Sequence, residues 1–381
     1  MSFKITYLTY QTFPASTANS IQTISNIKYL RKAGIEVKLL FPDRAQSSTS
    51  RIEELQKFYD FKETFEIYKL DHNYPFKDYK KNVSFKKLRF HISHFLWSKK
   101  VVSKAIDKKT EGEIFFTRSD WIFYFLDKRQ ENVIFECHQV SKIRKFLINN
   151  LIRSKSSFII FTNELLKNEF KVSCKNEVLP NAYDEELFNN HKISKNKNQI
   201  IFIGNLLRFN EDRNIQFLIK TFENHRLKEY ELLLVGGPED YKNKLDEKLK
   251  SKNIKNIGLV GELSHSETIN KVLESSVGIL INSSNNKHST HHTSPLKYFE
   301  YLRAELKIVG VDFPAHRVLP FSDKIYFFNE GSEEDLIRSI ENAVGENQAS
   351  NLNYTEYSLS KRTEAIIEIA ARLEGLEPPT L

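Results

Sequence analysis

The sequence predicts an α/β protein built from two parallel-sheet domains, and three observations support this. First, a chain of 381 residues with a hydrophobic content of 40% is long enough to bury two separate cores. Second, short apolar runs alternate with helical patterns along the whole chain, which is the order expected of βαβ units. Third, one polar stretch at 189–198, Asn-Asn-His-Lys-Ile-Ser-Lys-Asn-Lys-Asn, breaks this alternation and indicates a linker between domains.

The first domain is expected at 1–188. A helix is predicted over Ser20–Lys32 because Ile24 and Ile27 recur at helical spacing, and Gly34 is suited to end it. The predicted strands are Ile5–Tyr10, Glu36–Phe41, Phe65–Leu70, Ile114–Thr117, Val133–Glu136 and Phe158–Thr162.

The second domain is expected at 199–355 and shows the same alternation of short apolar runs and helical patterns. Its predicted strands are Ile200–Ile203, Leu232–Val235, Ile257–Val260, Val277–Ile281, Ile308–Val311 and Ile325–Phe328. Two successive domains of this kind are what two Rossmann-like halves would give.

The net charge of +8 is concentrated in the first half of the chain. Residues 1–190 hold 32 Lys and Arg against 22 Asp and Glu, a net +10, whereas the remaining residues hold 25 against 27, a net −2. The stretch Lys77–Lys109 alone has 11 basic residues against two aspartates, with five large aromatic residues among them. Such a segment fits a membrane surface, an acidic partner, nucleic acid or simply a solvated helical face.

Composition also indicates a compartment. No apolar run approaches the roughly 18–20 residues needed to span a bilayer, and the chain starts on a predicted strand without a signal-peptide pattern. The two cysteines, Cys137 and Cys174, are too few for a disulfide framework or a zinc site. A cytoplasmic location is therefore expected.

The segment His292–Leu302 carries the clearest functional signal. A polar loop runs into a predicted helix that opens at Ser294 with Pro295 in the first helical position. Backbone N–H groups from Thr293 to Lys297 would then point out of the helix start, where the positive end of the dipole favours a diphosphate. Glu300, one turn further in, is placed to accept two hydrogen bonds from the hydroxyls of a ribose.

With the other motifs, this segment resembles the family 4 retaining glycosyltransferases, which have the GT-B fold of two Rossmann-like domains facing a cleft. The resemblance covers almost the whole chain in the right order. Its motifs are Gly204-Asn205, Leu232–Gly237, Gly258–Gly261, Ser294–Leu302 and Val309–Asp312 with Pro314 in the second half, and Lys4–Tyr10, Leu30–Gly34 and Leu179–Asp184 with Phe188 in the first. Tyr357–Leu359 with Arg362 resembles the family's C-terminal helix, so a helix at 356–375 is expected to pack back toward the first domain.

The resemblance implies that the second domain binds a nucleotide sugar. Arg213 is implied as a cation for the departing diphosphate, with Arg208 as its alternative, while Lys297 either meets the diphosphate or pairs with Glu300. Position 205, where the family usually has arginine, holds Asn205. The implied donor-binding residues are Gly204, Asn205, Arg208, Gly236, Val260, Gly261, His292, Thr293, Ser294, Pro295, Leu296 and Glu300.

In the first domain, His138 follows a predicted strand and matches a histidine often found near the sugar, where it is expected to hydrogen-bond at the reacting centre. Arg118 ends the preceding strand and is a second candidate. Ser16 and Thr17 lie in an acceptor-side loop where the family usually has glycines, and these small residues preserve the space.

The expected activity is transfer of a hexose-type sugar, with retention, to a glycan or lipid-linked acceptor. No Asp-X-Asp pair follows a strand, so neither a metal nor another cofactor is expected. A lipid-linked acceptor would place the enzyme peripherally at the inner, anionic membrane face. Nucleic acid is not expected, because it explains the charge but not the ordered glycines.

Two rival functions remain open. His292 stands where the family has the first of two glutamates, and a histidine offers no carboxylate to sugar hydroxyls. With Asn205 and the glycine-free first loop, this favours a catalytically inactive nucleotide-sugar-binding subunit of the same fold. A non-hydrolysing sugar-nucleotide epimerase is the other alternative, although the segment Ser294–Leu302 suits it less.

Overall fold

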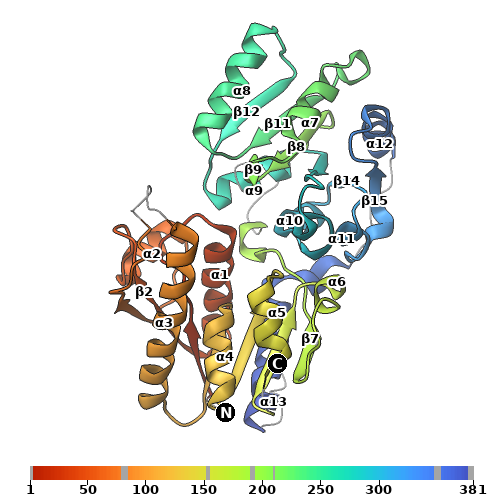
Figure 1. Ribbon diagram of the computed structural model, residues 1–381. Coiled ribbons are helices and arrows are strands. Elements are labelled where there is room, and N and C mark those ends of the chain that lie inside the picture. The colour runs from red at the N-terminus through yellow and green to blue at the C-terminus, as the bar shows by residue number, and fades with distance from the viewer. Residues whose placement is uncertain are drawn as a thin grey trace. The chain divides into compact units, whose positions relative to one another are not determined.

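The computed structural model describes residues 3–78, 85–151, 155–188, 194–208, 211–346 and 353–375, and it consists of two compact units (Figure 1). Unit 1 comprises Met1–Leu179 and Leu359–Leu381, and unit 2 comprises Pro180–Ser358. The prediction of two parallel-sheet α/β domains is confirmed. Residues 180–188, which the sequence analysis assigned to the first domain, belong to unit 2, and the first five residues of the expected linker lie outside the described residues.

Unit 1 contains a seven-stranded parallel sheet in the order β3-β2-β1-β4-β5-β6-β7. The chain builds outward from β1 through β2 to β3 and then returns to the other side of β1 as β4, so the strand order reverses between β1 and β4. The strands are β1 (Lys4–Leu8), β2 (Glu36–Asp43), β3 (Glu66–Asp71), β4 (Glu113–Thr117), β5 (Val133–Cys137), β6 (Ser157–Phe161) and β7 (Lys175–Val178).

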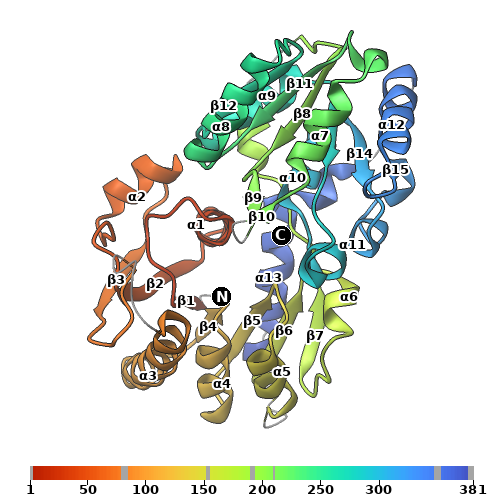
Figure 2. The same cartoon turned by 45° about the horizontal axis from the view of Figure 1, so that its top comes forward.

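Helices cover both faces of this sheet and form two apolar cores with it (Figure 2). One core includes Ile24 and Ile27 of α1, whose helical spacing predicted a buried face, together with Ile366 and Ile367 near the chain's end. The helices of this face are α1 (Ala18–Lys32), α2 (Ile52–Tyr59) and α13 (Leu359–Glu374). The opposite face carries α3 (Lys86–Asp107), α4 (Asp120–Lys128), α5 (Lys142–Asn149) and α6 (Glu164–Lys167).

Unit 2 contains a six-stranded parallel sheet in the order β12-β11-β8-β13-β14-β15, with the reversal between β8 and β13. The strands are β8 (Gln199–Ile203), β11 (Glu231–Val235), β12 (Ile257–Gly261), β13 (Val277–Leu280), β14 (Lys307–Val311) and β15 (Ile325–Phe328). A separate antiparallel pair, β9 (Leu207–Arg208) and β10 (Glu211–Asp212), follows β8.

The helices of unit 2 also lie on both faces of its sheet. One apolar core includes residues of α7 (Ile215–Phe222), α8 (Glu239–Ser251) and α12 (Glu333–Gly345), and the other includes residues of α9 (His265–Glu274) and α10 (Leu296–Arg303). The short α11 (Pro314–Arg317) follows β14. In neither unit is a helix, over its described length, both long and apolar enough to cross a membrane.

Candidate active site

Arg213 joins the ends of the two strands at which the order of the unit 2 sheet reverses. Open α/β sheets bind ligands outside the carboxyl ends of their strands at such a point. The Arg213 Nε donates a hydrogen bond to Asn282 Oδ1 (3.3 Å), just beyond β13, and its Nη1 donates to the carbonyl oxygen of Asn205 (3.1 Å), just beyond β8. The guanidinium group is thereby held at the position where an open α/β sheet binds its ligand.

Lys297, on the first turn of α10, brings a second cation to the same strand end. Its Nζ lies 3.6 Å from the centroid of the Phe202 ring on β8, and the Arg213 guanidinium lies 5.9 Å from that centroid. Nearby, burial lowers the pKa of His316 to about 4, and the charges of Lys297 and Arg213 contribute to the lowering. His316 is therefore neutral at pH 7, and Arg213 and Lys297 are the two cations at this strand end.

Two glycines allow the ends of β8 and β11 to approach each other closely. A Cβ atom on Gly236 would lie 2.1 Å from the carbonyl oxygen of Gly204, and Gly236 has a φ of +144°. A Cβ atom on Gly204 would lie 3.6 Å from Lys297 Nζ, so the lysine faces this glycine. Beside Arg213 the surface forms a small hollow, lined by Glu211, Asp212, Asn282, Ser283, Asn285, Asn286 and Ser289.

The start of α10 differs from the prediction by one position. The helix begins at Leu296, and Pro295 is its N-cap with extended backbone rather than its first helical residue, so the prediction for Pro295 was wrong. The Ser294 hydroxyl accepts a hydrogen bond from the Asn181 N–H (3.2 Å), and its carbonyl accepts one from the Asn181 side chain. These bonds fix the loop that leads into the helix, in which Thr293 and Ser294 lie.

Glu300, the predicted ribose ligand, is buried on α10, three residues beyond Lys297. Its Oε1 lies 2.6 Å from Nε2 of His265, the first residue of α9. Residues three apart share one side of a helix, so Lys297 and Glu300 present a cation and a carboxylate on the same side.

The remaining donor-side predictions lie around this group. Val260 and Gly261 end β12, the strand next to β11, and Gly261 has a φ of +84°. His292 is buried at the end of the short turn His288–His292, which packs against α11. Arg208 is on β9, but its side chain lies outside the described part of the chain.

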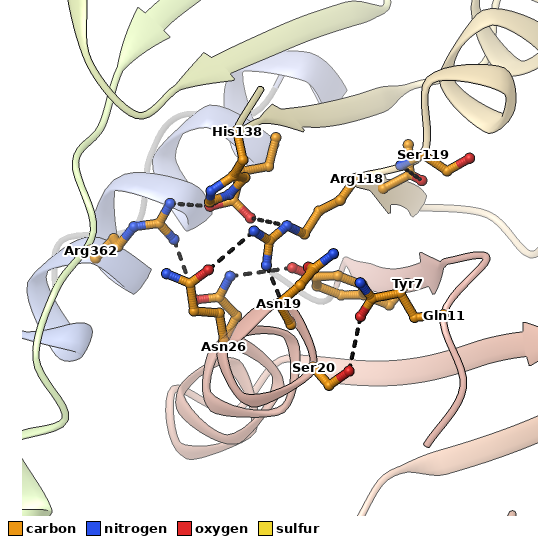
Figure 3. Close-up of polar contacts among 12 residues, drawn as sticks. Tyr7, Gln11, Asn19, Ser20, Asn26, Arg118, Ser119, His138 and Arg362 are labelled. Carbon is orange, nitrogen blue, oxygen red and sulfur yellow. Dashed lines mark hydrogen bonds and ion pairs between the residues drawn. The ribbon is translucent and has the colours of Figure 1, made fainter. Parts of the chain in front are cut away.

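In unit 1, His138 and Arg118 surround a buried carboxylate, Glu136 (Figure 3). The Glu136 Oε2 lies 3.6 Å from Arg118 Nε, and its Oε1 lies 3.3 Å from His138 Nε2. Arg362 of α13 donates to the same Oε1 and, through Nη1, to Asn26 Oδ1 (3.3 Å). Arg118 lies at the point of reversal between β1 and β4, and it also donates to the carbonyl of Asn19 (3.2 Å).

The ionisation of this cluster follows from burial and the two guanidinium groups. Burial alone would raise the pKa of Glu136, but Arg362, His138 and Arg118 outweigh it and hold that pKa well below the usual value. Burial and the Arg118 charge lower the pKa of His138 to about 4, although Glu136 opposes the shift. At neutral pH the carboxylate is ionised and His138 is neutral, able to donate one hydrogen bond and accept another.

The two acceptor-side residues of the first loop have different environments. Thr17 is the N-cap of α1, and its hydroxyl oxygen accepts a hydrogen bond from the Ser20 N–H (3.2 Å). Ser16 is exposed just before it. Thr17 thus has a structural role that its position in the loop did not reveal, because the sequence analysis started the helix two residues too late.

Five residues of these sites were not predicted from the sequence in the roles that the structure gives them: Asn282, His265 and Phe202 in unit 2, and Glu136 and Arg362 as partners in unit 1. Asn282 directly follows a predicted strand next to β8, so the rule that sites form at strand ends could have found it. His265 reaches Glu300 from another helix, and no local pattern marks that contact. Among the described residues, no three His, Cys, Asp or Glu side chains are placed to hold a metal ion.

Comparison with solved structures identifies the fold. A glycosyltransferase from Rickettsia africae matches with a TM-score of 0.68 at 15% identity, covering 97% of this chain and 98% of that one. Sucrose-phosphate synthase from Thermosynechococcus elongatus matches with a TM-score of 0.63 at 13% identity, covering 98% of each chain. A UDP-forming α,α-trehalose-phosphate synthase from Burkholderia xenovorans, in complex with glucose-6-phosphate, matches with a TM-score of 0.60 at 11% identity, covering 97% and 96%.

The chain has the GT-B fold. The similarity extends over practically the whole of each chain, so both parallel-sheet units have counterparts in these enzymes. No family model matches the sequence, and no curated protein is similar to it by sequence. At 11–15% identity the likeness establishes the fold, and an argument for activity has to come from the site residues.

Proposed function

We propose that the chain is a metal-independent, retaining glycosyltransferase that moves a hexose-type sugar from a nucleotide sugar to a glycan or lipid-linked acceptor. The observation that carries the proposal is the meeting of Arg213 and Lys297 around Phe202 and Gly204, where the strand order of unit 2 reverses. Two cations at this position are suited to bind a nucleoside diphosphate.

Sugar transfer breaks the bond between the anomeric carbon and the diphosphate, and negative charge accumulates on the departing diphosphate. Fixed cations stabilise that charge without reorganising during the reaction. Hydrogen bonds to Asn282 and Asn205 fix the Arg213 guanidinium group. The Lys297 ammonium group lies over the Phe202 ring, and its backbone belongs to α10. With these two groups in place, the proposed mechanism uses no metal.

The other residues have roles in positioning. Glu300 would accept hydrogen bonds from the ribose, and the backbone at Val260 and Gly261 would pair with the base. His138 is neutral at pH 7 and half-buried, so it is suited to hydrogen-bond a sugar hydroxyl. For retention, the acceptor hydroxyl would attack from the side of the leaving group, and the donor's diphosphate would take its proton.

The second candidate is an inactive nucleotide-sugar-binding subunit. It is favoured by His292, which is buried and offers no carboxylate where the resembled family has its first glutamate. An epimerase of the same fold is a third, weaker candidate. Binding of a nucleotide sugar is common to all three, whereas the chemical products differ.

The proposal is tested by measuring release of the nucleoside diphosphate from candidate donors. Arg213→Gln and Lys297→Gln should each lower turnover about 10²-fold or more, as loss of one preorganised charge-stabilising group does. Lys220→Gln, an exposed lysine of the same unit, is the matched control and should leave turnover unchanged. EDTA should have no effect.

Three results would contradict the proposal in different ways. Loss of activity in EDTA that magnesium restores would contradict the metal-free mechanism. Donor binding with neither transfer nor hydrolysis would favour the inactive subunit. Recovery of a nucleotide sugar with an inverted sugar centre would favour the epimerase.

A further inference from the structure

Helix α3 exposes an apolar stripe on the side that faces away from the core of unit 1. Phe85 at its N-cap is 79% exposed, and Leu88, Ile92 and Leu96 are 57%, 43% and 39% exposed. The spacing of four residues places Leu88, Ile92 and Leu96 in one line along the helix, and Phe85 lies three residues before Leu88. These four are half of the eight large hydrophobic residues that are exposed in the described chain. Exposed apolar residues are therefore concentrated on this helix.

The stripe is not the face that holds α3 in the fold. The helix buries Trp97, Val101 and Val102 against the sheet and α4. The folding of unit 1 therefore does not require apolar side chains at positions 88, 92 and 96. Within the described part of the chain nothing covers the stripe, so its apolar side chains are available for a contact.

Aromatic side chains extend the stripe onto the neighbouring helix α4. The Phe95 ring lies 4.8 Å from the Trp121 ring, which lies 6.1 Å from Phe125, and all three are half-buried. Helices α3 and α4 pack side by side on this face of the sheet (Figures 1 and 2). Aromatic residues of this kind, Trp above all, are enriched where a protein meets the boundary between lipid and water.

Basic side chains accompany the stripe along α3, and Lys99 and Lys100 come one turn after Leu96 on the same side of the helix. Helix α3 contains six Lys and Arg and one acidic residue, Asp107: the basic ones are Lys86, Lys87, Arg89, Lys99, Lys100 and Lys104. All six are exposed, and none forms an ion pair with another residue of the described chain. Lys128 and Arg129 add two further exposed cations at the end of α4. Exposed apolar side chains together with exposed cations are complementary to a surface that has anionic groups on its outside and an apolar layer beneath them.

We propose that the outer face of α3, with the adjoining aromatic residues of α4, docks on an anionic lipid bilayer. This inference rests on the proposed function, since it gives unit 1 access to a lipid-linked acceptor. A helix with exposed apolar side chains, six exposed basic residues and one acidic residue has the composition of a helix that lies in the plane of an interface. Binding of nucleic acid would explain the exposed lysines. It would not explain the exposed Leu88, Ile92 and Leu96, because aliphatic side chains form neither ion pairs with phosphates nor hydrogen bonds with bases.

The test is flotation of the full-length protein with two kinds of vesicle, phosphatidylcholine alone and phosphatidylcholine mixed with phosphatidylglycerol. The protein should float with the anionic vesicles and much less with the neutral ones, and rising salt should release it. The double substitution Leu88→Gln and Ile92→Gln should lower the partition coefficient at least about tenfold, because two side chains no longer enter the apolar layer.

Phe58→Gln is the matched control. Phe58 is 51% exposed on α2, on the opposite face of the same sheet, so flotation of this variant should equal that of the parent. A second variant, Lys99→Gln with Lys100→Gln, should weaken binding to anionic vesicles only. Circular dichroism of each variant would establish that the fold is intact.

The inference is overturned by equal recovery with neutral and anionic vesicles, by no flotation with either, or by unchanged flotation of the Leu88 and Ile92 variant. Capture by single-stranded RNA without flotation would overturn it in favour of a nucleic-acid surface. Donor binding, measured calorimetrically on the same preparations, separates the two proposals. Flotation without any donor binding would remove the proposed function alone, and donor binding without flotation would remove the docking surface alone.

Discussion

At the scale of single residues, the carboxylate of Glu300 is the proposed ligand of the ribose. Its oxygen already accepts a hydrogen bond in a buried position, from His265, so a ribose would meet a carboxylate whose orientation is fixed. Replacing it with glutamine keeps the shape of the side chain and removes the charge. Glu300→Gln should weaken binding of the nucleotide sugar by about 1–3 kcal/mol, measured by calorimetry. Unchanged affinity with an intact fold would remove Glu300 from the site.

Gly236 supports a second prediction at this scale. A Cβ atom there would lie 2.1 Å from a backbone oxygen of Gly204, so the ends of β8 and β11 would have to separate. Gly236→Ala should therefore lower both stability and donor affinity, because the shift would move the strand end beside Lys297. Gly345→Ala is the control, since that position has open space and an ordinary φ. Equal thermal stability of the two variants would show that the strand ends tolerate the shift.

At the scale of secondary-structure elements, the ion pair between Glu136 and Arg362 ties α13 to β5. Both side chains are almost fully buried, and removing Arg362 takes away the closer of the two guanidinium groups beside the buried Glu136 carboxylate, leaving Arg118 at 3.6 Å. Arg362→Met should lower the free energy of unfolding of unit 1 by about 3–5 kcal/mol in urea titration. Arg372→Met, on the same helix but in an exposed pair with Glu368, should cost less than about 1 kcal/mol. Similar losses in the two variants would contradict a special role for the buried pair.

The same pair predicts how stability depends on pH. The pKa of Glu136 is lower in the folded protein than its ordinary value of 4.5, so its contribution is complete above that value and is lost as the pH falls toward the folded-state pKa. The stability difference between the parent and Glu136→Gln should therefore shrink as the pH is lowered from 4.5. Urea titrations at several pH values would measure it, and a difference that grows on acidification would have the wrong sign.

Strands that are buried on both faces could be predicted from the sequence, whereas exposed or very short strands could not. Strands such as β6 and β8 are buried on both faces and appear in the sequence as apolar runs, so they were found. The edge strand β7, Lys-Asn-Glu-Val, alternates exposed and half-buried residues, and β9 and β10 have two residues each, so none of the three produced an apolar run. The position of Pro295 was predicted wrongly because helix ends shift by a residue or two with the hydrogen bonds around them, here the bonds of Ser294 with the distant Asn181.

The residues of the candidate site also differ in whether they could be predicted from the sequence. Gly204, Arg213 and Lys297 could be proposed because the family resemblance implied them, and their positions after a strand or near a helix start agree with a site at one edge of a parallel sheet. The partners of Glu300 and Glu136 could not. His265 and Arg362 reach these carboxylates from distant parts of the chain, and a contact across 226 residues, as between Glu136 and Arg362, leaves no periodic trace in the sequence.

At the scale of the whole molecule, both units place an arginine where the strand order of the sheet reverses. Arg118 lies between β1 and β4, and Arg213 between β8 and β13. Their surroundings differ, because Arg118 faces the buried carboxylate of Glu136 whereas Arg213 is joined by a second cation, Lys297. This difference supports the division of roles that we propose, in which unit 2 binds the anionic donor and unit 1 the acceptor.

The central claim is that unit 2 binds a nucleotide sugar between Arg213 and Lys297, and a thermal-shift screen of UDP-, GDP- and ADP-sugars tests it most directly. A donor present at about one hundred times its dissociation constant adds about 2.7 kcal/mol to stability, which raises the melting temperature measurably. We predict that at least one nucleotide sugar stabilises the parent and Lys220→Gln alike, and that Lys297→Gln loses most of the shift. No stabilisation by any nucleotide sugar, or the same shift in Lys297→Gln as in the parent, would contradict the account.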